Sequence, residues 1–178
     1  MTAAQPDAPD PRDDAPGGGP TPETRALEFF ARWGESFDAC AASFELLAED
    51  CVWDQRPIPR LTGPRAAVRF LTLTRHTLGL ETIDVEIVRV ASRGNVVHVE
   101  RVDRLRRADG SLIAAAPVAG VLTFTGDQVT HWREYFDSAG FVAQALTTSA
   151  AHLATRFAAT VRRSSRSAHQ PEVHPGYS

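Results

Sequence analysis

Residues 96–105 read Val96-Val97-His98-Val99-Glu100-Arg101-Val102-Asp103-Arg104-Leu105. A β-strand sends alternate side chains to opposite faces. One face of this strand therefore carries Val97, Val99 and Leu105 and, between them, Arg101 and Asp103. Burying a charged side chain is costly unless it is paired. A cation and an anion among aliphatic neighbours therefore predict a paired, functional site on the buried face of the strand.

A second segment shows the same pattern about thirty residues later. Residues 129–137 read Val-Thr-His-Trp-Arg-Glu-Tyr-Phe-Asp, so Trp132, Glu134 and Phe136 share a face. We predict that Glu134 meets Arg101 and Asp103 in one pocket and that the three form an enzyme site. The plainer alternative is a structural ion network with no catalytic role.

Working outward from these strands, a period of two predicts an antiparallel meander. We expect strands at about 81–90, 95–106, 111–124 and 128–136, joined by turns at Arg93-Gly94, Asp109-Gly110 and Gly126-Asp127. Helical spacing precedes them at about 21–38, 39–48 and 64–78, with a short strand at 51–55. Helices followed by a meander indicate an α+β fold, in which the helices pack on one face of a curved antiparallel sheet and enclose a pocket.

The boundaries of the expected domain follow from local signals. Thr21 and Pro22 are typical of a helix start, and Gly79 of a helix end. Residues 1–21 are rich in Pro, Gly and Asp, and we expect a disordered tail there. We expect the domain at 22–146, then a helical extension and disordered tail at 147–178, irregular from about residue 162. Thr147-Thr148-Ser149 is a candidate interruption of that last helix.

Composition excludes several classes of protein. The 178 residues carry a net charge of −3, which gives no electrostatic case for binding nucleic acid or an anionic membrane. No apolar run approaches the ~20 residues that span a bilayer, and no basic-then-apolar segment suggests a secretory signal. Cys40 and Cys51 lack a CxxC or Cys/His pattern, so free buried thiols in a reducing cytoplasm are favoured over a disulfide. We expect no metal and no cofactor.

Taken together, Glu100-Arg101-Val102-Asp103-Arg104-Leu105 and Trp132-Arg133-Glu134-Tyr135-Phe136-Asp137 resemble the limonene-1,2-epoxide hydrolase family. The resemblance covers roughly residues 21 to 146. This family is a branch of the group that shares the cone-shaped fold of nuclear transport factor 2, ketosteroid isomerase and the SnoaL-type polyketide cyclases. The resemblance therefore implies an NTF2-like cone.

The resemblance also implies roles for the three charged residues. Asp103 aligns with the acid that protonates the epoxide oxygen, Arg101 with the family's arginine, and Glu134 with the base that deprotonates water. The family has Asp where this chain has Glu134. It also holds the water with a Tyr-x-Asn pair, and Trp53 and Gln55 stand at those positions here. Trp donates hydrogen bonds but does not accept them, so the water site is altered.

These residues suit a one-step opening of an epoxide. One carboxylate takes a proton from water while a second, protonated carboxyl gives one to the epoxide oxygen. The leading hypothesis is a cofactor-independent epoxide hydrolase acting on a small apolar epoxide, with Trp53, Gln55, Trp132 and Phe136 as substrate- or water-binding residues. One alternative is an epoxide-opening or polyketide cyclase of natural-product biosynthesis, with a substrate hydroxyl as nucleophile and a polyketide-like substrate. Another is a non-catalytic ligand-binding module. Charge, hydropathy and cysteine usage lead us to expect a cytoplasmic protein with no nucleic-acid or membrane partner. Mainly by analogy with the family, and because Val96, Val102 and Tyr135 form an apolar outer face, we also expect a homodimer.

Overall fold

The computed structural model describes residues 19–55 and 59–167, with residues 157–167 described by their backbone alone. The helices are α1 (Pro22–Ala31), η1 (Arg32–Gly34), α2 (Phe37–Ser43), η2 (Phe44–Leu46), α3 (Gly63–Leu78) and α4 (Ser138–Ser167). The strands are β1 (Leu47–Gln55), β2 (Leu61–Thr62), β3 (Leu80–Arg93), β4 (Val96–Arg107), β5 (Leu112–Thr125) and β6 (Gln128–Tyr135). The tails were expected at 1–21 and from about residue 162. Residues 1–18 and 168–178 lie outside the described residues, but residues 162–167 continue helix α4, so the irregular tail does not begin at residue 162.

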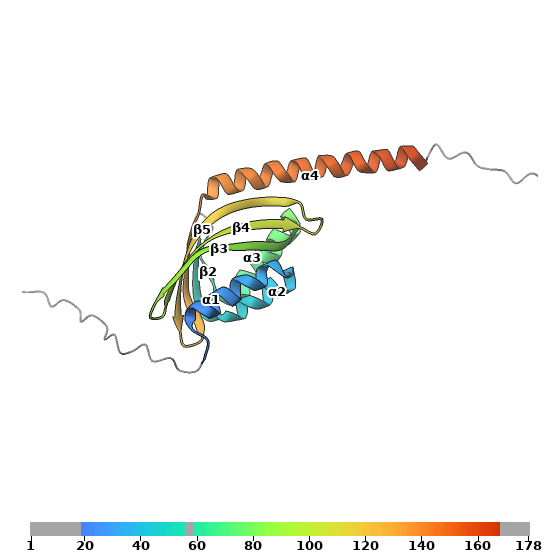
Figure 1. Ribbon diagram of the computed structural model, residues 1–178. Coiled ribbons are helices and arrows are strands. Elements are labelled where there is room, and N and C mark those ends of the chain that lie inside the picture. Colours follow the sequence, from blue (N-terminus) through green and yellow to red (C-terminus); the bar gives the residue numbers. More distant parts are fainter. Residues whose placement is uncertain (1–18, 56–58, 168–178) are drawn as a thin grey trace, which may run out of the picture.

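The six strands form one curved, open sheet in the order β2-β1-β6-β5-β4-β3 (Figure 1). The predicted meander is confirmed: β3 to β6 pair antiparallel with their neighbours, and Gly94, Gly110 and Gly126 adopt the positive φ angles that their turns require. The sequence did not predict that β1 joins β6 in parallel. Because β1 precedes the meander by a whole helix, no hairpin signal links it to its neighbour.

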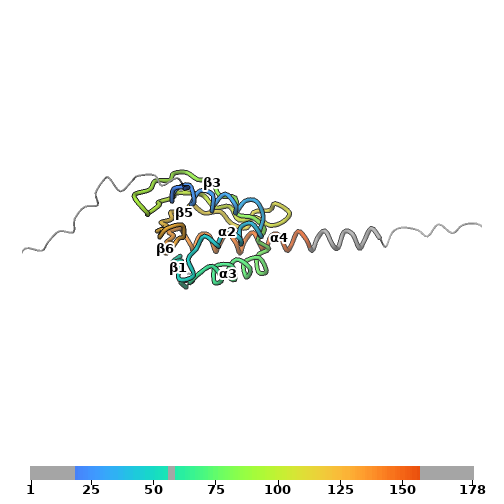
Figure 2. The backbone as a smooth tube through the Cα atoms, turned by 90° about the horizontal axis from the view of Figure 1, so that it is seen from below, coloured from blue at the N-terminus to red at the C-terminus, as the bar shows by residue number. Residues whose placement is uncertain are grey.

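The helices form a layer against one face of this sheet. Figure 2 shows α1 beside β3 at one edge and α3 beside β1 at the other, with α2 between them. Helix α4 lies along β5 on the side away from α1 and α2 and runs out past the sheet (Figure 1). The α+β class predicted from the sequence is therefore confirmed.

Two expected helices have different limits from those predicted. Thr21 caps α1 as expected, since its Oγ1 accepts from the Thr24 N–H over 3.2 Å. However, α1 ends at Ala31, and Ser36 starts a new helix by accepting from the Ala39 N–H over 3.1 Å. The second helix was predicted to run to residue 48, but β1 already begins at Leu47. The apolar residues at 47 and 48 fit the helical period as well as the strand period. Leu47 pairs with Val129 of β6, and this pairing makes the segment a strand.

The interruption expected at residues 147–149 is wrong, because α4 is continuous from Ser138 to Ser167. The hydroxyl of Thr147 donates to the carbonyl of Ala143 over 2.7 Å, so it bonds within the helix and does not break it. No helix in the described part of the chain combines the length and apolar character that crossing a bilayer requires.

The core lies between the helices and the sheet. Its centre is an aromatic cluster in which the rings of Phe29, Trp33, Phe44 and Trp132 contact one another. Both cysteines are buried and free, as predicted. Burial raises the pKa of the Cys40 thiol to about 12, and the charge of Asp103 adds to the effect. This thiol therefore stays protonated near neutral pH and is unreactive.

Candidate active site

A pocket of about 280 Å³ lies between the inner face of the sheet and the helices α3 and α4. Its wall is mostly apolar, with side chains from α3, from β3 to β5 and from the first turn of α4. Its charged side chains are Arg101, Asp103 and Glu134, and the amide of Gln55 joins them. A larger hollow, of about 560 Å³, lies between the end of α3, the β4–β5 turn and α4, and contains none of these groups.

The strand pattern brings the three charged residues together. Arg101 and Asp103 point inward from β4, Glu134 points inward from β6, and β5 lies between these strands. Gly120 on β5 pairs with Glu134. A Cβ at Gly120 would lie only 3.0 Å from Arg101 Nη1. The missing side chain therefore leaves room for Arg101 to cross β5 and reach Glu134.

Arg101 joins both carboxylates directly. Its Nε donates to Asp103 Oδ1 over 2.9 Å, and its Nη2 donates to Asp103 Oδ2 over 3.0 Å and also to Glu134 Oε1. All three residues are buried, and Arg101 is only 1% exposed. The guanidinium carbon lies 4.3 Å from the centre of the Phe30 ring and 5.6 Å from that of Trp33. The cation is thus fixed by two carboxylates on one side and by aromatic faces on the other.

Burial and charge act differently on the pKa values of Asp103 and Arg101. Burial raises the pKa of Asp103 to about 6, because the loss of hydration outweighs the stabilising charge and hydrogen bonds of Arg101, and the nearby charge of Glu134 adds to the rise. Burial lowers the pKa of Arg101, but the carboxylates of Glu134 and Asp103 more than offset this, so its net pKa is raised. The arginine therefore stays charged, while Asp103 is poised to exchange a proton near neutral pH.

Trp53 on β1 contacts the second acid. Its indole N–H donates to Glu134 Oε2 over 3.0 Å, and both side chains are buried. The Trp53 ring stacks on Trp132, with ring centres 4.3 Å apart and planes 2° apart. Because Arg101 holds Oε1, both oxygens of Glu134 accept hydrogen bonds from rigidly held donors.

Gln55 lies beside Glu134 in the parallel pairing of β1 and β6. Its side chain is 5% exposed and lines the pocket. Its Nε2 has no hydrogen-bond partner among the described residues. A buried amide donor without a partner normally binds water or a ligand, and this one is adjacent to Glu134.

Phe136 and Trp132, the other two residues expected to contact the substrate, differ in position: only Phe136 reaches the pocket. Phe136 lines the pocket, and its ring lies 5.8 Å from that of Phe141. Trp132 is fully buried behind Trp53 and does not line the pocket, so its expected contact with substrate is not supported. Strand alternation correctly predicted that Trp132 points inward, but it does not distinguish the core from the cavity.

Sequence reasoning missed two residues of the site. Trp33, in the 3-10 turn after α1, lines the pocket and lies beside Arg101. Gly120 provides the gap through which Arg101 passes. A glycine inside an apolar strand is a signal for close approach of another group, and this signal was available from the sequence. In the described part of the chain, no three His, Cys, Asp or Glu side chains are grouped so that they could hold a metal ion.

Solved structures confirm the fold. A SnoaL-like protein from Shewanella denitrificans OS-217 is similar over 71% of this chain and 97% of its own, with a TM-score of 0.57 and 18% identity. A second structure, described as an LEH-like epoxide hydrolase of Mycobacterium tuberculosis, has a TM-score of 0.53 and 26% identity. The similarity covers 75% of this chain and 96% of that one. The NTF2-like cone expected from the sequence is therefore confirmed.

Sequence comparison identifies the branch of this fold. Epoxide hydrolase EphG of Mycobacterium tuberculosis (strain ATCC 25618 / H37Rv) is 36% identical over 114 residues, which cover 63% of this chain and 71% of the relative. Residues 21–147 match the limonene-1,2-epoxide hydrolase catalytic domain. The chain therefore belongs to the limonene-1,2-epoxide hydrolase family.

Proposed function

We propose that this protein is an epoxide hydrolase that opens a small apolar epoxide in one step, without a cofactor. Membership of the family supports the reaction class. The observation that carries the residue-level proposal is that Arg101 joins the carboxylates of Asp103 and Glu134 at the wall of one apolar pocket. An apolar pocket favours a substrate without charged groups, because desolvating a charge there is costly.

Glu134 acts as the base. Its two oxygens accept from Arg101 Nη2 and from Trp53 Nε1. Both donors suit an ionised carboxylate, which is the form that removes a proton from water. The fixed ring of Trp53 and the fixed guanidinium hold this carboxylate in a single orientation toward the pocket.

Asp103 acts as the acid. A pKa of about 6 leaves a useful fraction of its carboxyl groups protonated near neutral pH. The same pocket thus holds two carboxyl groups with different tasks, and their surroundings explain the difference. Arg101 stays cationic throughout, stabilises whichever carboxyl is ionised and fixes the distance between the two.

The reaction balances with water as the only co-reactant. The water oxygen forms a bond to an epoxide carbon as its proton passes to Glu134. The bond from that carbon to the epoxide oxygen breaks, and the oxygen takes the proton of Asp103. The product is a vicinal diol. Transfer of one proton from Glu134 back to Asp103, by way of solvent, restores both groups.

Gln55 is the residue we assign to holding the water. Its unpartnered Nε2 donor is next to Glu134 and is buried at the pocket wall. Trp53 does not share this task, because its single N–H already donates to Glu134. The water is then held by one amide and by the base itself.

That reduced set of groups favours a second candidate function. If a hydroxyl of the substrate takes the place of water, Glu134 and Asp103 catalyse a cyclisation by the same proton transfers. The observation in its favour is that the Trp53 N–H is engaged and offers nothing to a water molecule.

An isotope experiment separates the two. The full-length protein is incubated with limonene-1,2-epoxide and styrene oxide, and with epoxides that carry an internal hydroxyl, in water enriched in oxygen-18. Hydrolysis predicts a diol with one labelled oxygen. Cyclisation predicts an unlabelled ether from the hydroxy-epoxides and no diol. Absence of turnover for the whole series would contradict both and favour a non-catalytic ligand-binding module.

A further inference from the structure

The first half of β5 has a strand on one side only. β5 pairs with β4 from Leu112 onward, but it pairs with β6 only from Ala119 onward. Residues 113, 115 and 117 therefore direct backbone groups toward a side that has no strand. Pro117 has no N–H to leave unpaired there, which suits an edge position. The remaining groups of this edge need partners from elsewhere.

Helix α4 supplies partners for two of these groups. The Ala115 N–H donates to Gln144 Oε1 over 2.5 Å, and Thr148 Oγ1 donates to the Ile113 carbonyl over 2.6 Å. Gln144 and Thr148 are four residues apart and lie on the same face of the helix. The helix thus covers the edge of β5 where β6 has ended.

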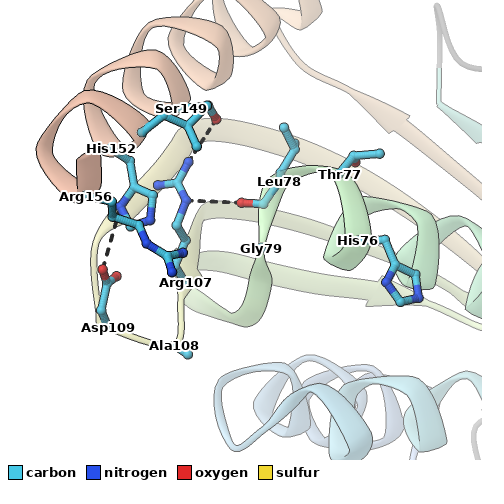
Figure 3. A pocket seen from close by; sticks show the side chains of 11 residues that line it. His76, Thr77, Leu78, Gly79, Arg107, Ala108, Asp109, Ser149, His152 and Arg156 are labelled. Atoms are coloured by element: carbon cyan, nitrogen blue, oxygen red, sulfur yellow. Dashed lines mark hydrogen bonds and ion pairs between the residues drawn. The ribbon is translucent and has the colours of Figure 1, made fainter. Parts of the chain in front are cut away.

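Arg107 fastens the same helix to two other elements. It is 7% exposed, and its guanidinium lies at the larger hollow between α3, the β4–β5 turn and α4 (Figure 3). Its Nε donates to the Leu78 carbonyl over 3.1 Å, its Nη1 to the Leu112 carbonyl over 3.1 Å and its Nη2 to Ser149 Oγ over 2.8 Å. One buried cation therefore ties the end of α3, the start of β5 and α4 together.

These elements also form the wall of the pocket that holds Asp103 and Glu134. Leu78 of α3 lines that pocket, and so do Phe141 and Val142 in the first turns of α4. Because α4 is continuous, the position of its first turns depends on where the following turns are fixed. Thr148 and Ser149 come directly after residue 147, where the match to the family's domain ends.

We propose that Thr148 and Ser149 are positioning residues for the pocket: they hold α4 so that Phe141 and Val142 close its wall, and they thereby set the affinity for an apolar substrate. The part of the chain beyond the matched domain then has a defined task in substrate binding. This inference rests on the proposed function only for the identity of the substrate.

The test uses the full chain with the double substitution Thr148→Val and Ser149→Ala. Each removes one hydroxyl and changes volume little. Loss of one hydrogen bond typically changes an equilibrium by about fivefold. We expect KM for limonene-1,2-epoxide to rise by about five- to tenfold, with kcat within about twofold of the parent. The Kd for this epoxide, from the fluorescence of Trp33 and Trp53 in the pocket, rises by the same factor. Amide hydrogen exchange of residues 141–146 becomes faster.

A matched control is the neighbouring Thr147→Val. The Thr147 hydroxyl donates only within its own helix, toward the carbonyls of Ala143 and Gln144. This variant should keep the parent's KM, Kd and exchange rates. Thermal unfolding of both variants separates a loss of stability from a loss of affinity.

The outcomes are distinct. Unchanged exchange in residues 141–146 of the double variant overturns the inference, as does faster exchange with unchanged Kd. A fall in kcat with constant KM also overturns it, since that result indicates a general effect on the site. If the parent binds the epoxide without turning it over, the proposed function fails, while exchange and Kd still test the role of Thr148 and Ser149.

Discussion

The indole N–H of Trp53 donates to Glu134 Oε2 over 3.0 Å, although the two residues are 81 positions apart in the chain. This bond makes Trp53 a partner of the proposed base, and its side chain also lines the pocket. The family resemblance implies a water-holding residue at this position. We propose that in this chain the residue holds Glu134 instead, with its ring stacked on that of Trp132.

Replacing Trp53 with Phe tests this role. The ring is largely kept, but Glu134 Oε2 loses its donor. A hydrogen bond to a charged group contributes ~1.5–3 kcal/mol, so we expect kcat/KM to fall by about tenfold or more. The matched control is Trp132→Phe, which keeps an aromatic ring against Trp53 and removes an Nε1 that has no hydrogen-bond partner among the described residues. That variant should lose stability but little activity. Equal losses of activity in both variants would show that packing alone matters.

Shortening the side chain of Glu134 is a second test of the proposed base. Its side chain spans the distance between Arg101 Nη2 and Trp53 Nε1. Glu134→Asp is one methylene shorter, and the backbone of β6 is fixed by β5 and β1. The shorter acid cannot satisfy both donors, so we expect kcat to fall by about tenfold or more, in line with loss of a positioned base. Steady-state kinetics on an apolar epoxide check this, and a fully active aspartate variant would contradict it.

The pH dependence of activity should report Asp103. Its pKa is about 6, and its protonated form is the proposed acid. Above that pH the protonated fraction falls, so kcat/KM should decrease about tenfold per pH unit on the alkaline side. The measurement is kcat/KM from pH 5 to pH 9. A rate that stays level up to pH 8 is incompatible with Asp103 as the acid.

The pH dependence of stability gives an independent test. The carboxyl of Asp103 has a pKa of about 6 in the folded chain, raised from 3.8. Between these values the folded chain binds a proton that the unfolded chain has lost, so this group's contribution to stability is present at low pH and is lost as pH rises through 6. From pH 4.5 to pH 7.5 the loss is about 2 kcal/mol.

Asp103→Asn removes this titration. Relative to the parent, the variant should therefore gain about 2 kcal/mol of unfolding free energy between pH 4.5 and pH 7.5. Urea unfolding at the two pH values measures the difference, and the many other carboxyls cancel because both proteins carry them. A constant difference between variant and parent would show that the pKa of Asp103 is not raised.

Much of the site follows from the alternation of residues in two strands. Arg101 and Asp103 are inward because Val97 and Val99 share their face, and Glu134 is inward for the same reason beside Trp132. A shift of one residue would expose these apolar side chains, so the register is strongly determined. The direction in which a side chain points is thus a local property that the sequence contains.

Contacts between distant segments could not be predicted in this way. The bond from Trp53 to Glu134 depends on the parallel pairing of β1 with β6, for which the sequence has no turn signal. At Thr148 and Ser149, helix α4 is continuous and both hydroxyls hydrogen-bond to distant segments, to the Ile113 carbonyl in β5 and to Arg107. Propensity alone suggested a break there because it does not include such partners.

The most direct test of the proposed chemistry is kcat/KM for limonene-1,2-epoxide in three variants. Asp103→Asn and Glu134→Gln are near-isosteric, and Arg101→Gln removes the cation that joins the two acids. Circular dichroism and thermal unfolding establish that each is folded. The control is Glu100→Gln, an exposed residue on the outer face of β4 that pairs with Arg89. We predict that each of the three loses about 10²-fold or more while the control keeps the parent's activity. Near-parental turnover in all three folded variants would contradict acid–base catalysis by these residues.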